Sequence, residues 1–264
     1  MLGGAGRVCC GTIFKLIPPA AGQTNWTKAT LYAFQGSPDG ITPVGAPYLD
    51  GKGNLFGVTL NGGSNLNCDP TPASGGCGTI FELVPPTAGR TDWTEVEITP
   101  SINMVYPYST LVADKKGALY GTAQVSTQTG SKGFGIVFRV TGATPSHPNG
   151  TFQDVYDFAN GSDGSQSKAG LTIDGKGTLY GTTMTGGTNF STSPLCLNGC
   201  GTVFKLTPTD ATGANWKETI VHRFNGPDGE YPTAPLLIDG TGALYGTASP
   251  TGYGSDGLVF KIVQ

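Results

Sequence analysis

Hydrophobic and polar residues alternate in short segments along the whole sequence, and Gly, Pro or Asp interrupts each segment. A period of two is typical of half-buried β-strands, and no window keeps a helical period long enough to compete. The clearest segment is Leu171–Thr183, in which a short apolar strand, an Asp-Gly turn and a second strand follow one another. Gly and Asp supply the positive-φ positions of a tight reversal, so this segment predicts a β-hairpin.

The hairpin recurs at Tyr48–Thr59, Leu111–Thr122 and Leu236–Thr247. We call its first strand type A and its Leu-aromatic-Gly-Thr strand type B. Type C reads Gly-Thr-Ile/Val-Phe, and type D is a strand, usually led by Trp, that ends in an aromatic residue and Phe. The pattern predicts types A and B at 44–59, 110–123, 169–183 and 234–248, type C at 11–16, 78–84, 135–140, 201–206 and 257–262, and type D at 26–34, 93–99, 151–158 and 216–224.

The repeats have a spacing of about sixty residues, which the type C Phe marks at Phe14, Phe81, Phe138, Phe204 and Phe260. Such a period in an all-β pattern predicts an array, and a β-propeller first of all. We expect one domain over 1–264, with repeats near 3–60, 61–124, 125–184 and 185–249 and a partial repeat over 250–264.

The first prediction for the architecture is about four four-stranded blades, with the ring closed by the terminal strands. Because type C occurs once more than four blades require, the surplus strand must add a fifth strand, compete with its twin or pair with another molecule. Five blades with one incomplete, and an open array that closes by dimerisation, are the alternatives. A monomer and a strand-exchanged dimer are both compatible with the pattern.

Charge and composition limit the classes of molecule that the protein is expected to bind. Charged residues make up 12% of the chain, Gly accounts for 43 of 264 residues, and the net charge is −3 without any basic block. Nucleic acid and anionic membrane surfaces are therefore not expected as partners. No window reaches the roughly twenty apolar residues of a membrane span. Residues 1–11 do not read as a signal peptide, so export would use a leader that has been removed or lies outside this sequence.

Six cysteines predict an oxidising compartment. Cys10, Cys77 and Cys200 each directly precede a type C segment, and each has a companion upstream, at Cys9, Cys68 and Cys196. Local pairing would close the loops 68–77 and 196–200 as disulfides, whereas a vicinal 9–10 bond is strained, so that pair is alternatively two free thiols. A zinc site is the competing hypothesis, but three pairs on three different blades cannot converge on one ion.

The runs from Asp163 to Pro208 and from Asp228 to Thr247 follow one consensus, with DG, an Asp-Gly hairpin turn, LYGT and, in the first run, CGTVFKLTP in order. This consensus resembles the GloVer tandem repeat of bacterial secreted proteins, and the likeness covers nearly the whole chain. The resemblance implies a propeller-like fold and an extracellular or cell-surface location. It implies no particular reaction.

Two repeated positions have a structural and a functional interpretation. Equivalent carboxylates could ring a cation such as Ca²⁺, but we favour Asp side chains that accept hydrogen bonds from their own turns; they are Asp50, Asp114, Asp174 and Asp239. The type B aromatics could line a sugar-binding face, but we favour packing between blades, with the hydroxyl groups on polar partners; they are Phe56, Tyr120, Tyr180 and Tyr245.

The candidate ligand contacts are less regular. Trp26, Trp93 and Trp216 lead type D segments and are favoured as caps of the blade edge, although they would contact a bound sugar. The sequence of repeat two differs from that of the other repeats over Glu97–Tyr108. Neutral sequence drift in a surface loop and a ligand-binding loop are both open explanations. The departing loop adds Tyr106 and Tyr108 to the candidates.

Histidine offers one further candidate. His222 stands where Tyr32 and Tyr156 stand in sister repeats, so a packing role is favoured, and a catalytic role would need Asp228 or Glu230 as partner. His147 lies in a Pro-rich turn. No nucleophile elbow, zinc-protease helix or phosphate loop occurs.

These features predict a secreted or surface-displayed module that binds a ligand, with carbohydrate as the favoured class, or acts as a scaffold. The alternative is a propeller hydrolase or lyase with its site at the mouth of the central channel. The sequence leaves the ligand, the catalytic residues and any cofactor open.

Overall fold

The computed structural model describes residues 10–64, 76–98, 104–126, 132–142, 150–187, 196–249 and 257–264. Within these ranges the chain forms eighteen strands in five antiparallel sheets and contains no helix, so none that could cross a membrane. The all-β prediction is confirmed.

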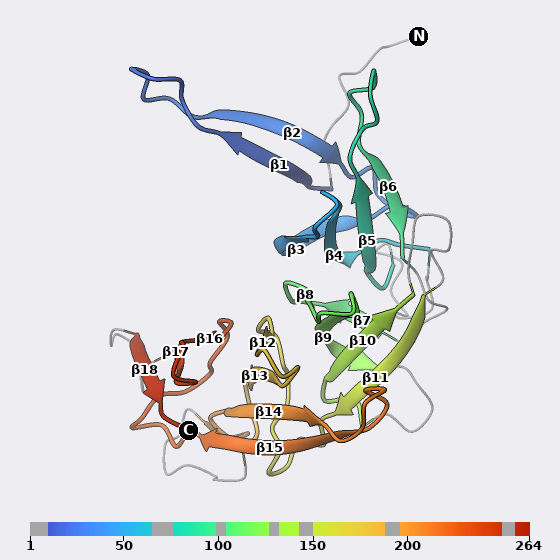
Figure 1. The fold of residues 1–264 in the computed structure, drawn as a ribbon. Coiled ribbons are helices and arrows are strands. Elements are labelled where there is room, and N and C mark those ends of the chain that lie inside the picture. The colour runs from blue at the N-terminus through green and yellow to red at the C-terminus, as the bar shows by residue number, and fades with distance from the viewer. Residues whose placement is uncertain are drawn as a thin grey trace.

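Two partial sheets flank three complete ones (Figure 1). The N-terminal hairpin consists of β1 (Thr12–Ile17) and β2 (Thr27–Ala33). Blade one contains β3 (Ile41–Leu49), β4 (Leu55–Asn61), β5 (Thr79–Val84) and β6 (Thr94–Glu97). Blade two contains β7 (Met104–Pro107), β8 (Val112–Ala113), β9 (Leu119–Ser126), β10 (Ile136–Thr141) and β11 (Thr151–Asp157). Blade three contains β12 (Thr172–Ile173), β13 (Leu179–Thr183), β14 (Thr202–Pro208) and β15 (Trp216–Arg223), and the C-terminal sheet contains β16 (Leu237–Ile238), β17 (Leu244–Ala248) and β18 (Leu258–Ile262).

The strand order in blades one and three is A-B-C-D, as the segment types predict. Blade two has the same order, but β7 and β8 both pair with β9, as the two halves of β3 pair with β4 in blade one. The type A strands β3, β8, β12 and β16 face the centre of the arc and the type D strands lie outside (Figure 1). The sheets are therefore arranged as the blades of a propeller, which confirms the predicted fold class.

The terminal strands stay in separate sheets. In the described residues β1 pairs with β2 and β18 pairs with β17, so the expected closure through these strands is not made within the chain, and the arc is open (Figure 1). The reason is that β1 and β18 are both type C strands, and β1 already occupies the edge of β2 that β18 would need. Together, the hairpin and the C-terminal sheet hold the strand types of a fourth blade with one type C strand to spare.

Hydrophobic core clusters lie between successive sheets and follow one rule. The Phe at the end of a type D strand packs edge-on against the type C Phe of the next sheet, with ring centroids 5.1 or 5.2 Å apart, in Phe34–Phe81, Phe158–Phe204 and Phe224–Phe260. Between blades one and two, Ile98 takes the type D place in the cluster that contains Phe138.

The Gly of the Leu-aromatic-Gly-Thr motif makes room for these rings. A Cβ atom at Gly57 would lie 2.5 Å from the ring tip of Phe81, and one at Gly181 would lie 2.6 Å from that of Phe204. Gly121 and Gly246 stand in the same relation to Phe138 and Phe260. The motif therefore keeps Gly because the type C ring of the neighbouring strand occupies the place of its side chain.

We expect Gly57→Ala to destabilise the protein by about 1–3 kcal/mol, the usual cost of overpacking a core, because the Phe81 ring is only 1% exposed and cannot move aside. Gly51→Ala is the matched control, since nothing lies within 4 Å of a Cβ atom there. Urea denaturation of both variants measures the difference. Equal midpoints for Gly57→Ala and the wild type would contradict this account of the motif.

A half-buried carboxyl lies where the hairpin meets blade one. Burial raises the pKa of Glu95 to about 7, and the charges of Asp39 and Glu97 contribute in the same direction. The Glu95 Oε1 atom is buried without a hydrogen-bond partner among the described residues. Asp39 belongs to the turn after β2, where its carboxylate accepts the Tyr32 hydroxyl at 3.1 Å.

The raised pKa predicts that the protein loses stability as the pH rises through the window from about 4.5 to about 7. The folded state holds a proton on Glu95 in that window and the unfolded state does not, so stability falls with increasing pH. Glu95→Gln should flatten the fall in melting temperature between pH 5 and pH 8, while Asp92→Asn, at an exposed position, should leave it unchanged. The same slope in wild type and Glu95→Gln would refute the prediction.

Candidate functional site

A pocket of about 530 Å³ lies in the seam between blades two and three. Three turns form it: the A–B turn of blade two after Ala113, the A–B turn of blade three after Ile173, and the C–D turn of blade three from Pro208 to Trp216. We call this cavity the inter-blade pocket. Its volume lies in the range of small-molecule sites.

Side chains of blade two hold the C–D turn of blade three. Lys116 Nζ donates to the Ala211 carbonyl and Arg139 Nη1 to that of Thr212, both at 3.0 Å. Within the turn, the Asp210 carboxylate accepts hydrogen bonds from Thr212, and further ones from Ala214 and Asn215, which hold its pKa well below the ordinary value. The turn is thereby fixed against the neighbouring blade.

Two aromatic side chains from different blades form one wall of the pocket. The rings of Tyr120 and Trp216 meet edge-on with centroids 5.7 Å apart, and the Arg139 guanidinium lies 5.9 Å from the Tyr120 centroid. The Tyr120 hydroxyl donates to Asp114 Oδ2 at 3.1 Å, and Trp216 Nε1 donates to the Gly213 carbonyl. Burial, followed by the charge of Asp114, raises the pKa of Tyr120 to about 12, so the hydroxyl keeps its proton at neutral pH.

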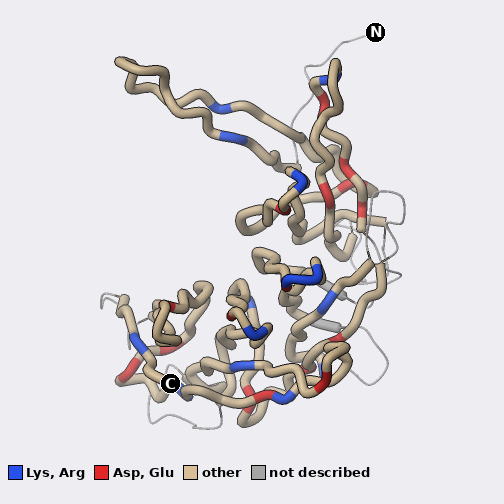
Figure 2. Tube along the Cα trace, viewed as in Figure 1, with Lys and Arg blue, Asp and Glu red and all other residues tan. Residues whose placement is uncertain are grey.

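Cations outnumber carboxylates in the lining, which contains Lys115, Lys116, Arg139 and Lys176 against Asp114, Asp174 and Asp210. Basic residues lie at the facing A–B turns of blades two and three (Figure 2). The carboxylates are occupied by their own turns; Asp174 Oδ1, for example, accepts the backbone N–H groups of Lys176 and Thr178 at 2.8 and 2.9 Å. The pocket therefore combines an aromatic wall with a rim that favours negative charge.

The favoured interpretation of the repeated Asp residues is confirmed. Each accepts two backbone N–H groups of its own turn through Oδ1, at 2.8–3.0 Å. The type B hydroxyls of Tyr120, Tyr180 and Tyr245 donate to the other oxygen. In blade one, where Phe56 has no hydroxyl, Asn54 Nδ2 makes that contact at 3.2 Å.

His222 occupies a packing position, as favoured. Its Nε2 lies 2.9 Å from Asp228 Oδ2, and the Tyr32–Asp39 and Tyr156–Asp163 pairs make the same contact at 3.1 Å. The ring also packs edge-on against Phe224, with centroids 4.8 Å apart. Asp228, rather than Glu230, is its partner.

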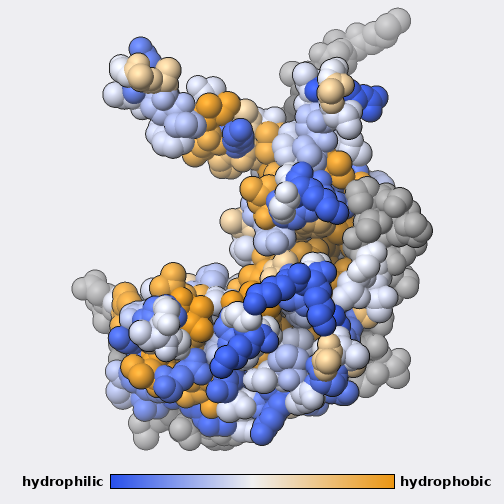
Figure 3. Space-filling model, in the orientation of Figure 1, coloured by the Kyte–Doolittle hydropathy of each residue, from blue (hydrophilic) through white to orange (hydrophobic). Residues whose placement is uncertain are grey.

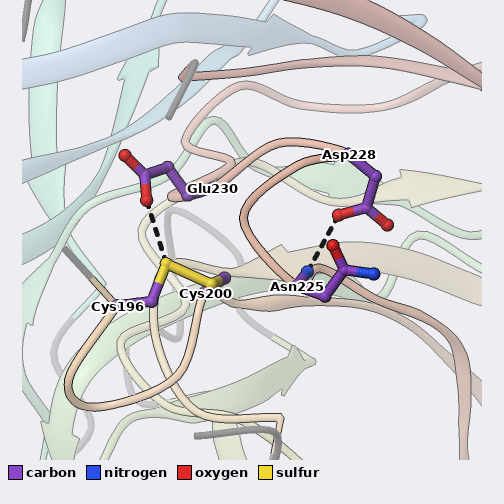
Figure 4. The surroundings of a disulfide bond; sticks show 5 residues. All are labelled: Cys196, Cys200, Asn225, Asp228 and Glu230. Carbon is purple, nitrogen blue, oxygen red and sulfur yellow. Dashed lines mark hydrogen bonds between the residues drawn. A yellow bond between two sulfur atoms is a disulfide. The ribbon is translucent and has the colours of Figure 1, made fainter. Parts of the chain in front are cut away.

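The predicted Cys196–Cys200 disulfide is present. Both cysteines are buried, and Glu230 Oε2 lies 2.9 Å from Cys196 Sγ (Figure 4). Cys10 and Cys77 are also disulfide-bonded. Their predicted companions, Cys9 and Cys68, lie outside the described residues, as does His147.

The remaining ligand candidates do not converge on the pocket. Trp26 is 60% exposed on the N-terminal hairpin, and Trp93 is half-buried against the cluster between the hairpin and blade one. Tyr108 lies below Lys168 Nζ, 5.5 Å from the ring centroid. Of the predicted contacts, only Trp216 lines the inter-blade pocket.

Tyr106 holds a special backbone position. Thr42, Gln166 and Tyr231 share its positive φ, between 50° and 60°, which is uncommon for residues other than Gly. In each case the backbone N–H donates to the residue just before the type C Gly, as Tyr106 does to Cys77. The stretch that departs in sequence thus keeps the backbone of its sisters at this point.

Sequence reasoning missed Lys115, Lys116, Arg139 and Asp210. One feature of the sequence could have indicated the pocket. Asp114 is followed by Lys115, whereas Asp50, Asp174 and Asp239 are each followed by Gly. Of the two A–B turns that line the pocket, the turn of blade two is the one that breaks the repeat.

The sequence profile of the Gloeobacter/Verrucomicrobia repeat matches residues 2–193 and, in a second register, residues 73–264. The chain belongs to the Gloeobacter/Verrucomicrobia repeat family. The predicted resemblance is thereby confirmed, and the overlapping matches agree with a repeat that continues through the chain. No curated protein matches.

Some solved structures resemble this Gloeobacter/Verrucomicrobia repeat protein at low identity. A provisionally assigned gluconolactonase is 13% identical over 77% of this chain and 56% of its own, with a TM-score of 0.45. A gluconolactonase from Xanthomonas campestris is 15% identical over 77% and 55%, with a TM-score of 0.41. A protein of unknown function from Dyadobacter fermentans is 14% identical over 85% and 61%, also with a TM-score of 0.41. The chain thus spans little more than half the length of these proteins.

Proposed function

We propose that the protein is an exported repeat module that binds a carbohydrate in the inter-blade pocket. The observation that carries the proposal is the meeting of Trp216 and Tyr120 in a pocket whose lining also carries several cationic side chains. The apolar face of a sugar ring packs on aromatic side chains, and its hydroxyl groups need donors and acceptors around them. The Cys196–Cys200 disulfide supports the exported location, because disulfides persist in oxidising compartments.

The excess of cations favours an acidic sugar within this class. Lys115 Nζ donates to the Gly175 carbonyl, and Lys116 and Arg139 hold the C–D turn, so these three cations also serve the seam. Lys176 is exposed on the A–B turn of blade three and lines the same pocket. An ammonium group there would attract the carboxylate of a uronic acid.

The binding test is calorimetric titration with neutral and uronate-containing oligosaccharides. We expect the acidic series to bind, and Trp216→Ala to weaken binding at least tenfold through loss of the stacking wall. Lys176→Ala should weaken binding of acidic sugars and leave any neutral binding unchanged.

The control is Lys52→Ala, at the equivalent place in the A–B turn of blade one and outside the pocket lining. It should bind as the wild type does. Because Trp216 also packs against the core between blades two and three, Trp216→Phe provides a variant that keeps an aromatic ring, and melting curves check the fold. No binding by the wild type, or equal binding by Trp216→Ala and the wild type, would overturn the proposal.

A further inference from the structure

Two apolar faces are exposed at opposite ends of the arc. On the N-terminal hairpin, Phe14 is 49% and Leu16 is 52% exposed. On the C-terminal sheet, Val259 is 78% exposed. Figure 3 shows hydrophobic surface on the hairpin and at the other end of the open arc.

The equivalent positions are buried wherever two sheets meet. Phe81, Phe138 and Phe204 correspond to Phe14 and are at most 1% exposed. The residues that correspond to Val259 are Ile80, Val137 and Val203, also at most 1% exposed. The exposure of Phe14 and Val259 therefore reflects a missing neighbour and not the residue type.

Inside the molecule these two positions belong to the same seam. The core between blades one and two contains Ile80 of the first sheet and Phe138 of the second, and the next core contains Val137 and Phe204. Each seam thus joins the type C aliphatic residue of one sheet to the type C Phe of the next. By the same rule, the face of Val259 fits the face of Phe14.

The side chains that form the inter-blade pocket also have counterparts at the two ends of the arc, some on the C-terminal sheet and one on the hairpin. In the inter-blade pocket, Trp216 packs on Tyr120 of the preceding blade, with Arg139 over the Tyr120 ring. On the C-terminal sheet, Tyr245 corresponds to Tyr120, and Lys261 Nζ lies 5.3 Å from its ring centroid. On the hairpin, Trp26 corresponds to Trp216 and is 60% exposed. The two ends of the chain therefore carry side chains equivalent to those on the two sides of the inter-blade pocket.

These two sets of side chains do not meet within one chain, because the ends of the arc lie apart (Figures 1 and 3). A second copy supplies both missing faces, since each copy offers one hairpin and one C-terminal sheet.

We propose that the C-terminal sheet of one copy docks head-to-tail on the N-terminal hairpin of a second copy. The contact covers Phe14 and Leu16 with Val259 and brings Trp26 beside Tyr245 and Lys261, so that a pocket of the same design as the inter-blade pocket forms across two copies. The association does not depend on the proposed function; only the ligand class of the shared pocket rests on it.

The test is the mass of the protein in solution by light scattering coupled to size-exclusion chromatography, from low to high micromolar concentration. We expect the wild type to associate with increasing concentration, and Phe14→Glu and Val259→Glu each to reduce the mass at equal concentration. Leu197→Glu is the control, because Leu197 is 74% exposed on a loop of the disulfide and takes no part in the contact. Since all three residues are exposed, the substitutions should leave the fold intact, which circular dichroism verifies.

Mixing the variants tests the direction of the contact. A tagged Phe14→Glu copy keeps an intact Val259 face and should capture an untagged Val259→Glu copy, which keeps an intact Phe14 face. It should not capture an untagged Phe14→Glu copy. A wild type that is monomeric throughout, variants with the wild-type mass, or a mixture that does not associate would each overturn the proposal. These results are independent of sugar binding, so the two proposals can fail separately.

Discussion

The packing of one aromatic ring on the next sheet is the interaction on which the rest of the structure depends. The type C Phe lies over a Gly of its neighbouring strand and meets the type D Phe, or Ile98, of the preceding sheet. It therefore belongs to two contacts at once, one within its own blade and one across the seam. Polar side chains such as Arg139 can reach the next blade only because this contact sets the spacing of the sheets.

Much of the fold was predictable because its determinants are local. Each Asp turn is specified by about four consecutive residues. The alternation of apolar residues predicted the strand bounds to within a few positions. Closure of the ring was not predictable in the same way, because it depends on the angles between sheets. The surplus type C strand indicated that β1 and β18 compete, but it did not indicate the outcome. No single repeat contains a sequence pattern that indicates the angles between neighbouring sheets.

The candidate site was harder to predict for a similar reason. Trp216 could be named from its place at the head of a type D strand, but Arg139 and the carbonyl groups it binds near Thr212 come together only across a seam. Lys115 was visible as a break in the repeat, yet sequence reasoning gave more weight to the larger departure over Glu97–Tyr108. That stretch instead keeps the left-handed backbone at Tyr106, and its strand β7 pairs with β9 as the first half of β3 pairs with β4.

The pocket has walls from two blades, and this couples occupancy to the mechanics of the propeller. Any molecule bound in the pocket against both Tyr120 and Trp216 touches both sides of a seam, so opening of that seam must release it. The free energy needed to separate blades two and three then includes the free energy of binding. Once the site is saturated, this contribution grows with the logarithm of the ligand concentration. Under the proposed function, the force needed to part blades two and three would report whether the pocket is filled.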